Sequence, residues 1–205
     1  VVPSFDEITN AFTYNILGSF KLLEAIRKNN IPVVYAGSST KLSYPGELHS
    51  PYAFFKSTIA KLVQGYGDWY DIKYNICYFY NVYGPRTDTW GNEWQSVINI
   101  FKKQKEEGVP LTITGDGTQR RDFTHVDDIV NGLILAGSNI RNQEFQLGTG
   151  EDYSILEIAA AFDHHIEFIE ARRGDRPKGL ADITTTKEVL GYEPTYNIID
   201  YIKSL

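Results

Sequence analysis

The sequence contains no methionine, not even at position 1, and only one cysteine, Cys77. A single cysteine excludes a disulfide bond within the chain and favours a reducing, cytoplasmic setting. Because a natural full-length chain begins with methionine, we expect residues 1–205 to be a fragment, or to lack some residues of the natural chain.

Three further absences narrow the function. No apolar run approaches the roughly 18 residues that a membrane-spanning helix requires, so no membrane partner is expected. The cysteine and the histidines show no spacing typical of a metal site, and the adjacent His164 and His165 suit packing or surface roles. The net charge of −6 comes from interspersed acidic and basic residues, so nucleic acid is not an expected partner.

The first 86 residues alternate between helix and strand patterns. Apolar side chains recur every three or four positions over residues 9–30 and predict an amphipathic helix, at Phe12, Ile16, Phe20, Leu23 and Ile26. A buried strand is predicted at 31–40, a helix capped by Ser50 at 50–67, and a second buried strand at 74–86. This order predicts an α/β fold with a doubly wound parallel sheet.

In such sheets, ligands bind beyond the carboxyl ends of the strands. Four polar residues fall at these ends: Ser38, Ser39, Thr40 and Asn81. The second half of the chain predicts shorter elements, with helices at 93–108, 125–137, 154–162 and 184–192 and strands at 111–117, 144–150 and 166–169. We therefore expect a smaller α/β lobe that leans over the strand ends.

Tyr52 and Lys56 are four residues apart in the helix predicted at 50–67. Four residues make about one turn, so both side chains project from one face. A tyrosine beside an ammonium group ionises more readily, because the positive charge stabilises the phenolate. Such a phenol can exchange a proton with a sugar hydroxyl. The alternative is an ordinary surface pair, because this spacing is common by chance.

Several motifs occur in the order that is typical of one family. They are NILGSFKLLEA, YAGSS, SPYAFFKS, YNVYGPR, RRDFTHVDDIV and ARRGDRPKGLADITTTKEVLGYEP. Together they cover most of the chain, which resembles the extended short-chain dehydrogenases that act on nucleotide sugars, the NAD-dependent epimerases and dehydratases. The resemblance implies that residues 1–90 are the C-terminal part of a Rossmann-like NAD-binding domain. Residues 91–205 would then be mainly a nucleotide-sugar-binding lobe, with some segments returning to the sheet.

The resemblance also implies roles for individual residues. Tyr52 would be the acid/base, Lys56 its electrostatic partner, and Ser38 the hydroxyl that polarises the reacting oxygen, with Ser39 and Thr40 as alternatives. The residues implied to bind NAD are Asn15, Ala36, Gly37, Ser38, Tyr52, Lys56, Phe79 and Val82. Those implied to bind the nucleotide sugar are Ser39, Thr40, Asn81, Arg121, Arg172 and Asp175.

Four assignments have alternatives. Asn15 could instead bond the backbone of its own helix, and Asn81 could simply end its strand. Arg121 could pair with Asp127 or Asp128 rather than with a diphosphate, and Arg173 competes with Arg172 in a register one residue along. Asp122 is expected to support its own loop.

The resemblance implies a UDP-sugar 4-epimerase, which oxidises the sugar transiently to a ketone with NAD. A dehydratase is less favoured, because Ser39-Thr40-Lys41 stands where those enzymes carry Asp-Glu. A decarboxylase or a reductase of nucleotide sugars also fits.

The family's glycine-rich loop, G-x-x-G-x-x-G after an early strand, does not occur in the sequence. We therefore expect roughly 70 to 80 residues before Val1, by the length of a strand-helix-strand unit. If those residues are absent, the alternative function is a non-catalytic remnant that binds the nucleotide sugar. By resemblance, the helices that hold Asn15 and Tyr52 would pair with their copies in a homodimer.

Overall fold

The computed structural model describes residues 3–42, 46–86, 96–171 and 175–205. Its main sheet has the order β1-β2-β7 and is parallel throughout, with β1 at Val33–Ser38, β2 at Tyr74–Phe79 and β7 at Gln143–Leu147. The predicted parallel sheet is confirmed. β7 comes from the second half of the chain and pairs directly with β2, so the sheet is assembled from both halves.

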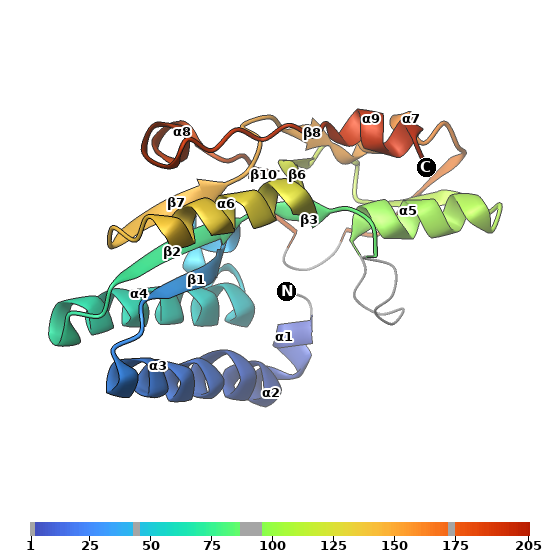
Figure 1. The fold of residues 1–205 in the computed structure, drawn as a ribbon. Coiled ribbons are helices and arrows are strands. Elements are labelled where there is room, and N and C mark those ends of the chain that lie inside the picture. The colour runs from blue at the N-terminus through green and yellow to red at the C-terminus, as the bar shows by residue number, and fades with distance from the viewer. Residues whose placement is uncertain (1–2, 43–45, 87–95, 172–174) are drawn as a thin grey trace.

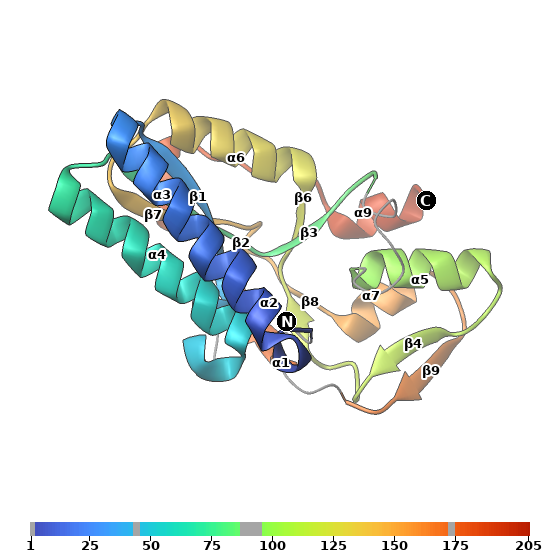
Figure 2. The same ribbon diagram turned by 90° about the horizontal axis from the view of Figure 1, so that it is seen from below.

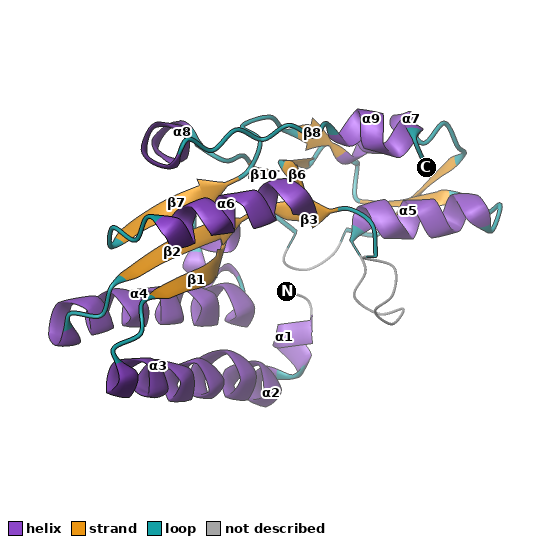
Figure 3. Ribbon diagram, viewed as in Figure 1, coloured by secondary structure: helices purple, strands orange, loops and turns teal. Residues whose placement is uncertain are grey.

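Helices cover both faces of this sheet (Figures 1 and 3). α3 (Gly18–Asn29) and α4 (Pro51–Tyr70) lie side by side on one face, as Figure 2 shows. α6 (Val126–Ser138) lies on the other face, with α8 (Thr184–Leu190) beside it. The core between α3, α4 and the sheet includes Leu23, Ile59 and Ile76, each at most 3% exposed.

The predicted N-terminal helix is present but begins earlier. α1 (Pro3–Asp6), α2 (Ile8–Phe12) and a π-helical segment (Thr13–Leu17) lead into α3. Leu23 and Ile26 are buried as the periodicity predicts, whereas Phe12 and Phe20 are 49% and 44% exposed. The apolar stripe thus continues beyond the part that the sheet and α4 cover.

The strand predicted at 74–86 is two strands. β2 ends at Phe79, and β3 (Asn81–Tyr83) leaves the main sheet to pair in parallel with β6 (Phe123–His125). The second group of elements follows from there. β4 (Leu111–Thr114) pairs with β9 (Ile166–Ile169), and β5 (Arg120–Arg121) lies between β8 (Tyr153–Ser154) and β10 (Lys178–Gly179).

Three helices complete this second group: α5 (Val97–Glu106), α7 (Ile155–Ala161) and α9 (Ile198–Lys203). They enclose a separate core that includes Phe101, Leu111 and Phe162. Short 3-10 turns, Ser39–Lys41 and Glu47–His49, connect β1 to α4. In the part of the chain that the structure describes, no helix has the length and apolar character needed to cross a membrane. The same residues contain no cluster of acidic, histidine and cysteine side chains suited to a metal ion.

Candidate active site

The start of α4 positions the Tyr52–Lys56 pair. Ser50 caps the helix, because its side-chain oxygen accepts a hydrogen bond from the backbone N–H of Ala53 at 3.1 Å, and Pro51 occupies the first turn. The backbone N–H of Tyr52 donates to the hydroxyl of Ser4 at 3.1 Å. The N-terminal segment therefore fixes the turn from which Tyr52 and Lys56 project.

Lys56 reaches across to the carboxyl end of β1. Its ammonium donates a 2.6 Å hydrogen bond to the carbonyl of Ala36 and lies 4.7 Å from the ring centre of Tyr35. Burial lowers the pKa of Lys56, because the charged form loses solvation. The contact joins two segments that are separate motifs in the sequence, the Tyr-Lys helix and the YAGSS strand.

Tyr35 is a residue of this site that the sequence analysis missed. Burial raises the pKa of the Tyr35 hydroxyl, and the nearby Tyr52 raises it further. Tyr35 and Gly37 alternate along β1 and share a face of the sheet. The available signal was this alternation, which sets Tyr35 on the face that α4 covers, within reach of Lys56.

Three hydroxyl residues lie at the end of β1: Ser38 is its last residue, and Ser39 and Thr40 follow it. Ser39 and Thr40 are both 4% exposed, whereas Ser38 is more accessible. The Ser38 hydroxyl accepts hydrogen bonds from the hydroxyl of Thr40 at 3.0 Å and from its backbone N–H at 3.4 Å. Ser38 is therefore the member of the group best placed to meet a ligand, with Thr40 behind it.

The remaining NAD-site candidates lie on or beside β1 and β2. Ser38 faces Phe79 in the parallel register, and Ala36 is exposed. Gly37 packs so closely that an added Cβ would lie 2.6 Å from the Tyr78 ring. Val82 is half-buried on β3, beyond the end of β2. The strand ends thus bring Ala36, Ser38 and Phe79 together, while Gly37 serves close packing.

Asn15 lies apart from this group of contacts. It occupies the π-helical segment, and its side-chain amide donates to the carbonyl of Ala11 at 2.8 Å. The alternative that Asn15 bonds its own helix backbone is therefore observed. Departures of this kind from α-helical geometry are frequent at functional sites.

Asn81 and Asp122 connect β3 to β6. Both the backbone N–H and the side-chain amide of Asn81 donate to the carbonyl of Asp122 at 3.0 Å. The Asp122 carboxylate is fully buried and accepts hydrogen bonds from Thr149, Gly150, Ala181 and Thr124. Burial raises the pKa of Asp122, and the hydrogen bonds from Thr149, Gly150 and Ala181 oppose that rise. The expectation that Asp122 supports its loop is confirmed.

Arg121 pairs with Asp175, not with Asp127 or Asp128. Its Nη2 lies 2.6 Å from the Asp175 carboxylate, and its Nη1 donates to the carbonyl of Arg120 at 2.8 Å. Asp128 instead accepts hydrogen bonds from Thr195 and Tyr196. Burial lowers the pKa of Arg121, while the negative charge of Asp175 opposes that effect. Arg172 and its competitor Arg173 lie outside the described residues.

Comparison with known proteins identifies the family. The profile of the NAD-dependent epimerase/dehydratase family matches residues 2–155. A UDP-glucose 4-epimerase of Mycolicibacterium smegmatis is 32% identical over 211 residues, which cover 94% of this chain and 65% of that protein. The chain therefore spans about two thirds of the length of this curated relative.

Solved structures agree with this match. The UDP-glucose 4-epimerase of Thermotoga maritima with UDP-glucose superposes with a TM-score of 0.89 at 28% identity, covering 98% of this chain and 71% of that one. The UDP-glucuronic acid 4-epimerase of Bacillus cereus, in complex with UDP-glucuronic acid and NAD, gives 0.80 at 27% identity, covering 94% and 66%. From the profile match and the 32% identical relative, the chain belongs to the NAD-dependent epimerase/dehydratase family.

Proposed function

We propose that the full-length gene product is an NAD-dependent epimerase that inverts the 4-hydroxyl of a UDP-linked sugar. The observation that carries this proposal is the 2.6 Å contact of Lys56 with Ala36, which joins the first turns of α4 to the carboxyl end of β1. Ligands bind at this edge in parallel α/β sheets. The similarity to UDP-glucose and UDP-glucuronic acid 4-epimerases supports the substrate class.

The chemistry of the residues at this edge fits NAD. The Lys56 ammonium carries three donors, and among the described residues one hydrogen-bond acceptor is found for it, the carbonyl of Ala36. The remaining donors suit ribose hydroxyls. The other residues proposed to hold NAD are Asn15, Gly37, Ser38, Tyr52, Phe79 and Val82. When bound, NAD takes up a hydride from the sugar and gives it back.

The residues of this chain would handle the proton. Tyr52, as a phenolate, accepts the proton of the sugar hydroxyl and later returns it, while the Lys56 ammonium stabilises the negative charge. The Ser38 hydroxyl donates to the same sugar oxygen and steadies the charge that develops there. Return of the hydride to the opposite face of the carbonyl carbon, and of the proton to its oxygen, would leave the epimer and no net oxidation.

The nucleotide part of the substrate is proposed to bind at β3, β5 and the start of β10. Arg121 offers a planar, permanently charged group that suits a diphosphate, and Asn81, Ser39, Thr40 and Arg172 complete the proposed set. Asp175 would act through Arg121, because a carboxylate repels phosphate and this one already holds the Arg121 guanidinium at 2.6 Å. We also propose that residues 1–90 belong to the NAD-binding domain and 91–205 mainly to the sugar-nucleotide lobe.

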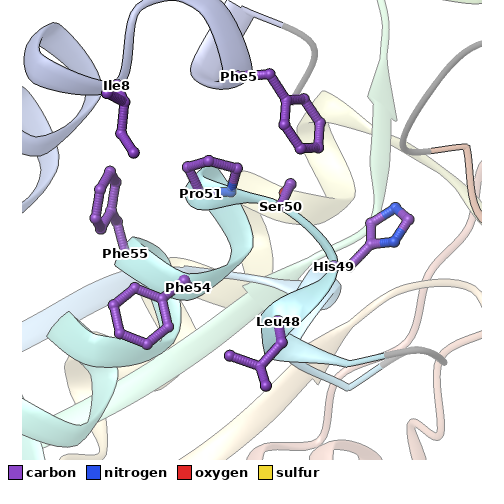
Figure 4. Close-up of a pocket in the computed structure, with 8 residues that line it drawn as sticks. All are labelled: Phe5, Ile8, Leu48, His49, Ser50, Pro51, Phe54 and Phe55. Carbon is purple, nitrogen blue, oxygen red and sulfur yellow. The ribbon is translucent and has the colours of Figure 1, made fainter.

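A homodimer is proposed through the helices that hold Asn15 and Tyr52. Apolar side chains are exposed along them, with Ile8 at 54%, Phe12 at 49% and Phe54 at 45%. Ile8 and Phe54 line a groove of about 520 Å³ between the N-terminal helices and α4. Figure 4 shows Ile8 pointing toward Phe55 across this groove. A patch of this kind marks an interface in soluble proteins, and a second copy of the chain offers the complementary apolar surface.

We propose a reducing, cytoplasmic setting, in which a lone thiol stays free. Cys77 is fully buried, and burial raises its pKa to about 12, so the thiol is inert.

The proposed function is tested by incubating the full-length gene product with NAD and either UDP-glucose or UDP-glucuronic acid. The expected result is the 4-epimer of at least one of them, without accumulation of NADH. A dehydrated or decarboxylated product would replace epimerisation with another reaction of the family. Binding of the UDP-sugars without any turnover would support the non-catalytic remnant.

A further inference from the structure

Two neutral groups hold the Lys56 ammonium at a half-buried position. It donates a 2.6 Å hydrogen bond to the carbonyl oxygen of Ala36, and its Nζ lies 4.7 Å from the centre of the Tyr35 ring. Among the residues that the structure describes, no carboxylate pairs with Lys56. Burial lowers the pKa of Lys56, because the charged form has lost solvation. The carbonyl and the ring are therefore the groups that compensate this charge.

Charged side chains on the elements around α4 pair elsewhere. On α3, Glu24 forms an ion pair with Arg27 at 2.8 Å. In the 3-10 turn after β1, Lys41 pairs with Glu144 of β7 at 3.0 Å. Both of these elements contact α4, yet neither contributes a counter-ion to Lys56. The lysine thus depends on its two neutral partners.

The Tyr35 ring is held in place by the fold itself. Tyr35 is the third residue of β1 and packs against the core between the sheet, α3 and α4. Its register partner on β2 is Ile76, which is fully buried. The ring therefore forms a fixed surface over which the ammonium of Lys56 lies.

The distance between Lys56 and Tyr35 suits a cation–π interaction. A cation within about 6 Å of a ring centre is attracted by the negative face of the ring, and more strongly where water is excluded. The 4.7 Å separation meets this criterion. Since the ring attracts the charged amine and not the neutral one, it favours the ammonium and opposes the effect of burial.

The neutrality of these partners matters for Tyr52. Tyr52 and Lys56 are one helical turn apart on the same face of α4, so a charge placed beside Lys56 also acts on the Tyr52 phenol. A carboxylate would keep Lys56 charged, but it would repel the phenolate and cancel the benefit. The titratable groups that face Lys56 are instead two tyrosines, Tyr35 from β1 and Tyr52 from α4 itself.

We propose that Tyr35 is a positioning residue for Lys56: its ring keeps the ammonium charged and in place beside Tyr52 without adding a negative charge. The inference rests on the proposed function, in which the Lys56 ammonium stabilises the Tyr52 phenolate. It adds a residue to that machinery. Tyr35 acts through Lys56 and is not assigned a contact with the substrate.

The test measures the pKa of Lys56 directly in the full-length gene product. The rate at which acetic anhydride acetylates Lys56 is followed against pH by mass spectrometry, with the exposed Lys61 as internal reference. Tyr35→Phe keeps the ring, and Tyr35→Leu removes it. Tyr70→Leu is the matched control, because it removes a ring over which Arg27 lies at 5.0 Å, at the other end of α4.

Tyr35→Leu should lower the pKa of Lys56. At a given pH, the ratio of charged to neutral amine should fall about 2- to 30-fold, the range of a cation–π interaction. Tyr35→Phe and Tyr70→Leu should titrate as wild type does. If the ring only filled space, Tyr35→Leu would admit water to the ammonium and raise the pKa. A rise, or no change, would overturn the proposal.

A second substitution decides the matter if Tyr35→Leu does not fold. A fluorinated phenylalanine at position 35 keeps the shape of Tyr35→Phe, but its fluorine atoms withdraw negative charge from the face of the ring. The pKa of Lys56 should then be lower than in Tyr35→Phe, because the cation–π attraction is weaker. Equal pKa values in these two proteins would refute the role of the ring.

Failure of this inference is distinguishable from failure of the proposed function, because acetylation does not depend on turnover. An epimerase whose Lys56 pKa is insensitive to the ring at position 35 would refute the inference and keep the function. A lower Lys56 pKa in Tyr35→Leu, in a protein that forms no 4-epimer, would support the contact of Tyr35 with Lys56 and refute the epimerase.

Discussion

Lys56 Nζ lies 2.6 Å from the carbonyl oxygen of Ala36, a residue that precedes it by 20 positions. The same ammonium lies 4.7 Å from the centre of the Tyr35 ring. α4 is therefore tied, through its second turn, to the carboxyl end of β1. This relationship places Lys56, the second residue of the Tyr52–Lys56 spacing, at the edge where parallel sheets bind ligands.

Lys56→Ala should shift the acid side of the pH–rate profile upward. A phenol that loses a neighbouring cation ionises less readily, so a higher pH is needed to form the base. Burial lowers the pKa of Lys56, so in wild type the helpful charge is present below that pKa and is lost as pH rises through it. The measurement is kcat/KM against pH, with Lys61→Ala, an exposed lysine of the same helix, as control. Superimposable profiles for wild type and Lys56→Ala would remove the electrostatic role.

Arg121→Ala should weaken UDP binding by about 10- to 150-fold, because a charge-assisted contact to the diphosphate contributes about 1.5–3 kcal/mol. Arg120→Ala is the matched control. The side chain of Arg120 is held by Asp152 and Glu157 instead. Calorimetric titration with UDP compares the two variants. If Arg121→Ala binds UDP as wild type does, the role of Arg121 is structural and consists of its ion pair with Asp175.

Asp122→Ala should destabilise the fold by about 3 kcal/mol or more, because each buried donor left without an acceptor costs about 1–3 kcal/mol. Its carboxylate gathers donors from Thr149, Gly150 and Ala181 at a fully buried position. Asp122→Asn keeps one acceptor oxygen and should lose less. Denaturant unfolding measures both, beside the control Asp163→Asn at an exposed position. Equal stability of Asp122→Ala and the control would contradict this role of Asp122.

Phe54→Asp should convert a dimer into a monomer. Phe54 is 45% exposed, so a charge there perturbs the proposed interface more than the core. Light scattering after size exclusion gives the mass of each species. Val130→Asp is the control, because Val130 is 48% exposed on α6, on the opposite face of the sheet. A wild-type monomer, or a Phe54→Asp dimer, would count against the interface.

Local sequence patterns predicted where helices begin better than they predicted which side chains are covered or how the strands pair. Ser50 and Pro51 mark the start of α4 because caps and first-turn prolines act within a few residues. The exposure of Phe12 and Phe20 was not predictable, since a helical period does not reveal how far a covering partner extends. The break at Tyr80 also escaped prediction, because β2 and β3 form one continuous apolar run in the sequence but pair in different sheets.

In the candidate site too, features set by local spacing were predictable and contacts between distant residues were not. The position of Ser38 at a strand end and of Lys56 one turn after Tyr52 could be read from spacing. The Arg121–Asp175 pair could not, because it links residues 54 positions apart and depends on the pairing of β5 with β10.

The central claim is that Tyr52 exchanges the proton of the sugar hydroxyl. Its most direct test is the turnover rate of Tyr52→Phe in the full-length gene product, with UDP-sugar affinity measured alongside. The account predicts a rate lower by about 10²- to 10⁴-fold, the usual contribution of a general acid–base group, with affinity nearly unchanged. A Tyr52→Phe rate within about two-fold of wild type, far above that range, would contradict it.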